Sequence, residues 1–183
     1  MVLHVLERAQ QAKRLDKVIV LTDDERILNV VRQAGHTAIM TSPDCLNGTE
    51  RIADYLKTSQ EGDLFVNIQG DEVLLNATHV DELIAGFLDH EDAEMGTLAH
   101  WESDPDILRS PSTAKVVTDM EGNALYFSRN CIPITQQGAL PDRALVQVGV
   151  YIYMRDTVMR LSRLQQSPLE SIEKLEQLRA LEH

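Results

Sequence analysis

The sequence predicts an α/β fold with a largely parallel sheet and helices on its faces. Short apolar runs typical of strands alternate with segments whose apolar residues recur at helical spacing. This strand–helix–strand order is typical of parallel sheets, because a crossover between parallel strands leaves room for a helix. The run from Leu64 to Glu72 is central, since its apolar, branched first half is expected to form a strand buried on both faces.

Composition limits the classes of function. With 183 residues, we expect one domain spanning 1–183, and 43% hydrophobic residues are enough for a core. A net charge of −12 argues against a nucleic-acid surface, though not against a nucleotide held by a local arginine or Mg²⁺. Cys45 and Cys131 lack metal-ligand spacing, and no apolar run suits a signal peptide or a membrane span. We therefore expect a soluble, cytoplasmic protein that binds no membrane.

The elements of the N-terminal part follow in order. Apolar side chains at helical spacing predict a helix over 2–12, and 18–21 is a short strand. Caps and acids in 22–25 precede a helix over 27–34, which Gly35 ends before a strand at 37–40. A doubly wound fold usually opens with a strand rather than a helix, so we expect that a leading strand and its loop are missing from these residues.

A loop rich in turn residues spans 41–51 and leads into another helix. Asn47 or Thr49 is the expected N-cap, and Arg51 follows in the first turn. The backbone N–H groups here could receive an anion, and Arg51 could reach a phosphate or a base edge. The alternative, an ordinary capped helix with a solvent-facing arginine, is favoured by the local sequence alone.

The central strand ends abruptly in Gln69, Gly70, Asp71 and Glu72. Ligands of open α/β sheets lie just beyond the carboxyl ends of the strands, so this polar corner is a candidate site. Asp71 could hold Mg²⁺, which binds one or two carboxylates together with phosphate oxygens and water. Equally, the two acids could merely cap a following turn.

The C-terminal part begins with a helix over 80–87, a strand at 95–99 and a loop over 102–111. Two strands, 114–118 and 124–128, are joined by a tight turn, and the longest strand spans 145–154. Its alternation places Gln147, Gly149, Tyr151 and Tyr153 on one face, which lines a pocket or is the wetter side of the sheet. A short helix over 157–164 precedes a last helix that starts at Ser167 and carries a leucine-rich stripe. The acidic side chains on or beside that stripe are most simply interpreted as part of a solvated helix face.

Nine stretches, in this order and spacing, closely resemble the CMP-Kdo synthetases, which are the 3-deoxy-manno-octulosonate cytidylyltransferases. Each motif alone is weak, but nine in register are highly specific. The stretches are HVLERA (4–9), TDDERI (22–27), MTSPD (40–44), GTERIA (48–53), VNIQGDE (66–72), KVV (115–117), ALYFSR (124–129), GVY (149–151) and LEQLR (175–179).

The resemblance implies a three-layer α/β fold with a mixed, mostly parallel sheet of the nucleotide-diphospho-sugar transferase type, usually in a homodimer. It implies an enzyme that transfers the cytidylyl group of CTP to Kdo with release of pyrophosphate, for lipopolysaccharide biosynthesis, with Mg²⁺ as cofactor. By motif match, Asp71 is the metal ligand, and the catalytic candidates are Gln69, Asp71 and Arg129. The nucleotide side comprises Gly48, Thr49, Arg51 and Asp71, and the sugar side comprises Gln69, Arg129, Gln147, Tyr151, Glu176 and Gln177.

The sequence also departs from the family pattern. Nothing matches the family's opening loop, Arg-x-x-Ser-x-Arg-x-Pro-Gly-Lys-Pro, or its late Val-Asp-Thr-Pro-Glu-Asp segment, so we expect impaired activity of this chain alone. Gln147 replaces a histidine, Val73 a proline and Cys45 a common histidine. The alternatives are a non-catalytic remnant that keeps the fold and dimer surface, and a cytidylyltransferase for a different sugar acid.

Overall fold

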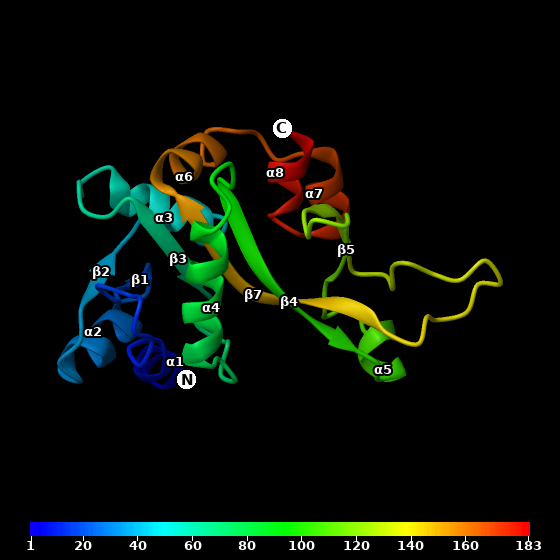
Figure 1. Cartoon of the computed structure of the whole chain (residues 1–183). Helices are drawn as coiled ribbons and strands as arrows, with labels where there is room; N and C mark the ends of the chain where they lie inside the picture. The colour runs from blue at the N-terminus through cyan, green and yellow to red at the C-terminus, as the bar shows by residue number, and fades with distance from the viewer. The chain divides into compact units, whose positions relative to one another are not determined.

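The computed structural model describes residues 1–183, whose helices and strands alternate as Figure 1 shows. The chain forms two compact units. The first unit comprises Met1–Thr97 and Gly149–Arg163, and the second comprises Leu98–Val148 and Leu164–His183. The single domain expected from chain length stays a prediction. None of the helices has both the length and the apolar character needed to cross a membrane.

The first unit contains most of the strand–helix repeats. Strand β1 pairs with β2 in parallel, and β3 pairs with β7 antiparallel, with Leu64 opposite Met154 and Ile68 opposite Val150. Its elements are α1 (Val2–Ala9), β1 (Val20–Thr22), α2 (Glu25–Gln33), β2 (Ala38–Met40), α3 (Gly48–Leu56), β3 (Leu64–Ile68), α4 (Ala77–Leu88), the start of β4 (Met95–Glu102), the end of β7 (Ala144–Met154) and α6 (Arg155–Leu161).

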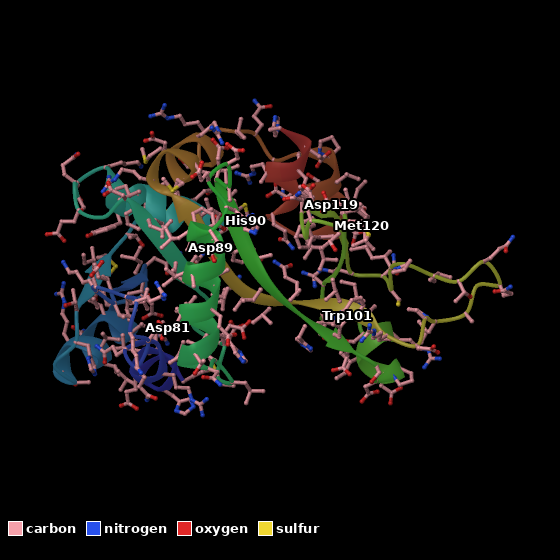
Figure 2. The ribbon with its side chains drawn as sticks, viewed as in Figure 1. Asp81, Asp89, His90, Trp101, Asp119 and Met120 are labelled. Carbon is pink, nitrogen blue, oxygen red and sulfur yellow. The ribbon has the colours of Figure 1, made fainter.

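Side-chain caps fix where the helices of this unit begin. The side chains of Asp24, Asn47 and Asn76 each accept a hydrogen bond from a backbone N–H in the first turn of α2, α3 and α4. The Asp81 carboxylate of α4, labelled in Figure 2, accepts from the N–H groups of Lys13 and Arg14 at 3.0 and 2.8 Å. These two bonds tie the segment after α1 to α4.

A cavity of about 880 Å³ lies inside the first unit. Its wall includes residues 14–22, which contain β1, and residues 64–68, which are β3. Strand β1 pairs only with β2, and β3 pairs only with β7, so each keeps one edge without a partner strand. For this reason β3 is mostly half-buried, with only Asn67 fully buried, rather than buried on both faces as expected.

The second unit is built on antiparallel pairs. Strand β5 (Lys115–Thr118) pairs with β6 (Ala124–Ser128) and with the start of β7, where Lys115 lies opposite Val146. Its core packs Val116 and Phe127 against Leu175 and Leu178. A helix that the sequence did not reveal, α5 (Pro105–Arg109), begins with proline after the Asp104 cap. Trp101, labelled in Figure 2, lies under the Arg143 guanidinium, 4.3 Å from the ring centre.

The described strand pairs lie in two separate sheets and include both parallel and antiparallel pairing. One described pair, β1–β2, is parallel, whereas β3–β7, β5–β6 and β5–β7 are antiparallel. The parallel share is thus smaller than the strand–helix rhythm indicated, because the long strand β7 runs against both β3 and β5.

The prediction of one long final helix is wrong. The chain forms α7 (Pro168–Glu173) and α8 (Leu178–Glu182), separated by Lys174 in the left-handed conformation with φ of 55°. A left-handed residue ends an α-helix, so the leucine-rich stripe is interrupted and Ile172 is left 77% exposed.

A buried ion pair joins the two short helices. The Arg179 guanidinium donates from Nε and Nη2 to the two carboxylate oxygens of Glu170, at 2.8 and 2.7 Å, and the two side chains are only 7% and 4% exposed. Glu170 also accepts from the Ser167 N–H at 3.2 Å. Because the guanidinium is planar, these two parallel hydrogen bonds fix the placement of α8 relative to α7.

We expect Glu170→Gln or Arg179→Met to lower the free energy of unfolding by about 3–5 kcal/mol, because each leaves a buried charge unpaired. The double variant Glu170→Leu/Arg179→Met should lose much less unfolding free energy, because it leaves no unpaired buried charge. Urea unfolding followed by circular dichroism measures all three. Equal losses in the single and double variants would contradict a stabilising role for the pairing.

The same pair predicts a pH dependence of stability. Burial would raise the pKa of Glu170, but hydrogen bonds from Arg179 and Ser167 hold it below its usual value. Because the pKa of Glu170 is lower in the folded than in the unfolded chain, its ionisation stabilises the fold. This contribution is complete above the pKa of the unfolded chain, about 4.3, and is lost as the pH falls through the pKa of the folded chain. The difference in unfolding free energy between the wild type and Glu170→Gln should therefore become smaller below about pH 4. A difference that does not change with pH would contradict this.

We also expect the cavity to bind an apolar dye. Anilinonaphthalene sulfonate should bind the folded protein, and Ile19→Glu should weaken binding, because it places a charge in the cavity wall. The matched control is Leu74→Glu, at a side chain that is already 86% exposed. Fluorescence titration measures both, and equal dye affinity in the two variants would contradict binding in the cavity.

Candidate active site

The candidate site residues divide between the two units. The first-unit cluster is Gly48, Thr49, Arg51, Gln69, Asp71 and Tyr151, and the second-unit cluster is Arg129, Gln147, Glu176 and Gln177.

The start of α3 presents the first residues of the first-unit cluster. Asn47 is the N-cap, and its side-chain oxygen accepts from the Glu50 N–H at 2.9 Å. The Glu50 carboxylate accepts in turn from the Leu46 N–H, also at 2.9 Å. These reciprocal bonds fix the loop where it enters the helix, whose positive end favours an anion near Gly48 and Thr49.

Gly48 lies against an amide of β3. A Cβ at this position would lie 2.4 Å from Nδ2 of Asn67, so any larger residue would displace the amide. Asn67 is only 9% exposed, and its Nδ2 has no hydrogen-bond partner in the structure. Sequence reasoning gave Asn67 no role, although an amide within an apolar strand was a usable signal.

Two tyrosines of β7 support the same region. The Thr49 hydroxyl donates to the Tyr153 hydroxyl at 3.1 Å, in a buried contact between α3 and β7. The rings of Tyr151 and Tyr153 stack with centroids 6.1 Å apart and planes 21° apart. The alternation predicted for this strand is confirmed, and both rings lie on a buried face rather than a wet one.

Arg51 is anchored rather than free in solvent. It donates from Nη1 to the Thr41 hydroxyl at 2.7 Å and from Nη2 to the Asp23 carboxylate at 3.2 Å. Its side chain is 19% exposed. The solvent-facing alternative for Arg51 is therefore wrong, and the guanidinium has a defined position beside the start of α3.

The end of β3 carries an unpaired carboxylate. Gln69 and Asp71 are exposed in a turn closed by the bond from the Glu72 N–H to the Gln69 carbonyl, 3.1 Å. The Asp71 carboxylate has no hydrogen bond or ion pair within the chain. No group of three or more His, Cys, Asp or Glu side chains is placed to hold a metal. One free carboxylate therefore fits Mg²⁺ bound mainly by phosphate oxygens and water, and does not fit a metal cage made by protein alone.

Glu72 does not cap the turn as one interpretation supposed. Its carboxylate accepts from the Gly149 N–H of β7 at 3.0 Å. A Cβ on Gly149 would lie 2.4 Å from the same oxygen, so only glycine leaves room for this contact. The bond fixes the turn that carries Asp71 to the neighbouring strand.

In the second-unit cluster, Arg129 is bound to the backbone. Its Nε donates to the Glu173 carbonyl at 2.8 Å, Nη1 to the Pro111 carbonyl at 2.9 Å and Nη2 to the Lys174 carbonyl at 3.1 Å. A guanidinium has five N–H groups, so two remain for a ligand. Arg129 thus has fewer N–H donors available to a ligand than an unbound arginine would.

The Glu173 carboxylate collects donors from β6 and is not on a solvated helix face. It accepts from the Tyr126 and Ser128 hydroxyls at 3.1 and 2.7 Å and from the Arg129 N–H at 2.9 Å. Burial would raise the pKa of Glu173, but these hydrogen bonds hold it below its ordinary value. Sequence reasoning missed this residue, because only the folded chain brings β6 to the end of α7.

Gln147 and Gln177 form one amide pair. The Gln177 amide donates from Nε2 to Oε1 of Gln147 at 2.5 Å, and Gln177 is almost fully buried. The structure thus brings together two candidates that lie 30 positions apart in the sequence. Glu176 precedes this pair on the same segment and is half-buried.

Comparisons with known proteins cover the whole chain. A family model described as cytidylyltransferase matches residues 1–183. The 3-deoxy-manno-octulosonate cytidylyltransferase of Myxococcus xanthus is 41% identical over 183 residues, which are 100% of this chain and 74% of the relative. The protein of that name from Fusobacterium nucleatum is 42% identical over 98% of this chain and 72% of its own length.

Solved structures agree with this match. A CMP:2-keto-3-deoxy-manno-octonic acid synthetase complexed with CTP superposes with a TM-score of 0.89 at 38% identity, over 99% of this chain and 74% of that protein. A cytidylyltransferase from Leptospira borgpetersenii gives a TM-score of 0.55 at 17% identity over 95% of this chain and 60% of its own, and it supports the fold alone. These matches confirm the nucleotide-diphospho-sugar transferase fold class, and the chain belongs to the 3-deoxy-manno-octulosonate cytidylyltransferase family.

Proposed function

We propose that this chain transfers the cytidylyl group of CTP to 3-deoxy-manno-octulosonate, forming CMP-Kdo and pyrophosphate. The observation that carries the proposal is the unpaired Asp71 carboxylate at the carboxyl end of β3, on a turn that Glu72 fixes to β7. The proposal is supported by relatives of that name that match almost the whole of this chain and by the structural match to a synthetase complexed with CTP.

The first-unit cluster would hold the nucleotide and the metal. Gly48 and Thr49 offer the positive end of α3, and Arg51 adds a fixed cation beside it. Asp71 would bind Mg²⁺ together with phosphate oxygens. The ion would neutralise charge developing on the phosphates. By motif match alone, Gln69 and Tyr151 are further binding candidates of this unit.

The second-unit cluster would receive the sugar acid. The two remaining N–H groups of Arg129 suit a carboxylate, whereas Gln147, Glu176 and Gln177 suit hydroxyls. Cytidylyl transfer needs the sugar's anomeric hydroxyl in line with the bond from the α-phosphorus to the leaving pyrophosphate. Most of the rate would therefore come from positioning and from charge stabilisation.

The proposal also includes a cytoplasmic location, a role in lipopolysaccharide biosynthesis and a homodimer. The location is supported by composition, and the other two by the resemblance to the family. The alternatives remain a non-catalytic remnant and a transferase for another sugar acid, the latter favoured by Gln147 where the family has histidine.

The first test combines binding with turnover. We expect CTP to bind in a Mg²⁺-dependent manner by calorimetry, and pyrophosphate release from CTP to require Kdo. Asp71→Asn should lower that release by about 100-fold or more, because it removes the metal's charged ligand. The matched control is Asp89→Asn, at the exposed C-cap of α4 labelled in Figure 2.

Each alternative gives a distinct result in this test. Mg²⁺-dependent CTP binding without turnover on any 2-keto sugar acid would favour the remnant, and turnover on an acid other than Kdo would favour changed specificity. No CTP binding at all would contradict the proposal.

The Glu72–Gly149 contact gives a second test. Gly149→Ala should lower the free energy of unfolding by about 1–3 kcal/mol, because the new methyl group displaces the Glu72 carboxylate from its backbone donor. The control is Gly86→Ala in α4, where a Cβ meets no atom within 4 Å, and a gain of about 0.5–1 kcal/mol is expected. Urea unfolding measures both, and an unchanged Gly149→Ala variant would contradict the argument.

A further inference from the structure

Lys115 is the most deeply buried cation of the chain, with a side chain that is 0% exposed. Its Nζ donates to the carbonyls of Ser110, Thr113 and Arg129 at 2.7, 2.8 and 2.6 Å. An ammonium has three N–H groups, so all three are used on backbone carbonyls. A buried charge is costly unless it is fully hydrogen-bonded, and here that condition is met.

The three carbonyls come from two separate segments. Ser110 and Thr113 lie between α5 and β5, whereas Arg129 follows β6. One atom therefore holds the loop before β5 and the chain after β6 at a fixed separation. A neutral side chain of similar length could not offer three donors from a single atom.

Arg129 passes this constraint on to the end of α7. Its backbone carbonyl is held by Lys115, and its N–H donates to the Glu173 carboxylate. Its guanidinium donates to the carbonyls of Glu173 and Lys174. The left-handed turn at Lys174, which separates α7 from α8, is thus fixed by Arg129.

The segment that follows this turn carries Glu176 and Gln177. We propose that Lys115 is a positioning residue, which fixes Arg129 and, through it, the turn that places Glu176 and Gln177. The identity of the ligand that these side chains would meet, a sugar acid, rests on the proposed function, but the positioning itself does not. Lys115 touches no ligand in this scheme and acts through the backbone.

The test compares Lys115→Met with Leu108→Ala. The first variant removes all three donors, whereas the second keeps them and removes a fully buried side chain from the neighbouring cluster around Cys131, Ala144 and Val146. Leu108→Ala therefore lowers stability through packing loss and leaves the three hydrogen bonds of Lys115 in place. Lys115→Gln, which keeps two N–H donors on one nitrogen, is the milder variant if Lys115→Met does not fold.

Hydrogen exchange with mass spectrometry reads the turn directly. We expect the amides of Lys174, Leu178 and Arg179, which are all hydrogen-bonded, to exchange about tenfold faster in Lys115→Met than in Leu108→Ala at matched global stability. Equal exchange in the two variants at matched stability would overturn the proposal, because it would leave Lys115 with a purely structural role.

Kinetics give a second readout. We expect Lys115→Met to raise KM for Kdo by about tenfold and to leave KM for CTP unchanged, with neither altered in Leu108→Ala. An equal rise in both constants would also overturn the proposal. Absence of turnover in the wild-type chain would contradict the proposed function instead, and the exchange measurement would still decide the role of Lys115.

Discussion

The antiparallel pairing of β7 is the interaction on which the rest of the structure depends. In the first unit β7 is the only strand partner of β3, and in the second it pairs with β5. The opposite edge of β3 faces a cavity instead of another strand. The position of the Asp71 turn therefore rests on β7, through the strand ladder and through the bond from Gly149 to Glu72.

Both units fix their candidate residues by bonding side chains to backbone groups. Glu72 binds a strand N–H, Arg129 binds the carbonyl of the last residue of α7, and Lys115 binds carbonyls of the segments beside β5 and β6. Backbone groups are themselves fixed by the fold, so each such bond defines a single side-chain position. Asp71 differs, because its carboxylate has no partner within the chain, and a group without an internal partner is suited to a ligand.

The sequence was sufficient wherever local rules decide structure. Asn47 was one of two expected caps and is the cap observed, and the alternation along β7 was correct through Tyr153. It was insufficient where distant groups compete with local propensity. The final helix has continuous helical spacing, yet it breaks at Lys174, because the Arg129 guanidinium binds the carbonyls of Glu173 and Lys174. Arg129 lies 45 positions from Lys174, and a contact between such distant residues leaves no signal in the local hydrophobic periodicity.

The pair formed by Gln147 and Gln177 has a chemical consequence for the second unit. A histidine at position 147, as in the family pattern, would gain a proton between about pH 5 and 8, whereas an amide stays neutral across that range. The charge available to an acidic ligand in this unit must then come from fixed cations. Lys115 spends all three N–H groups on carbonyls, so Arg129, with two N–H groups remaining, is the cation of the cluster that can supply it. The anchoring of Arg129 therefore matters more here than it would beside a titrating histidine.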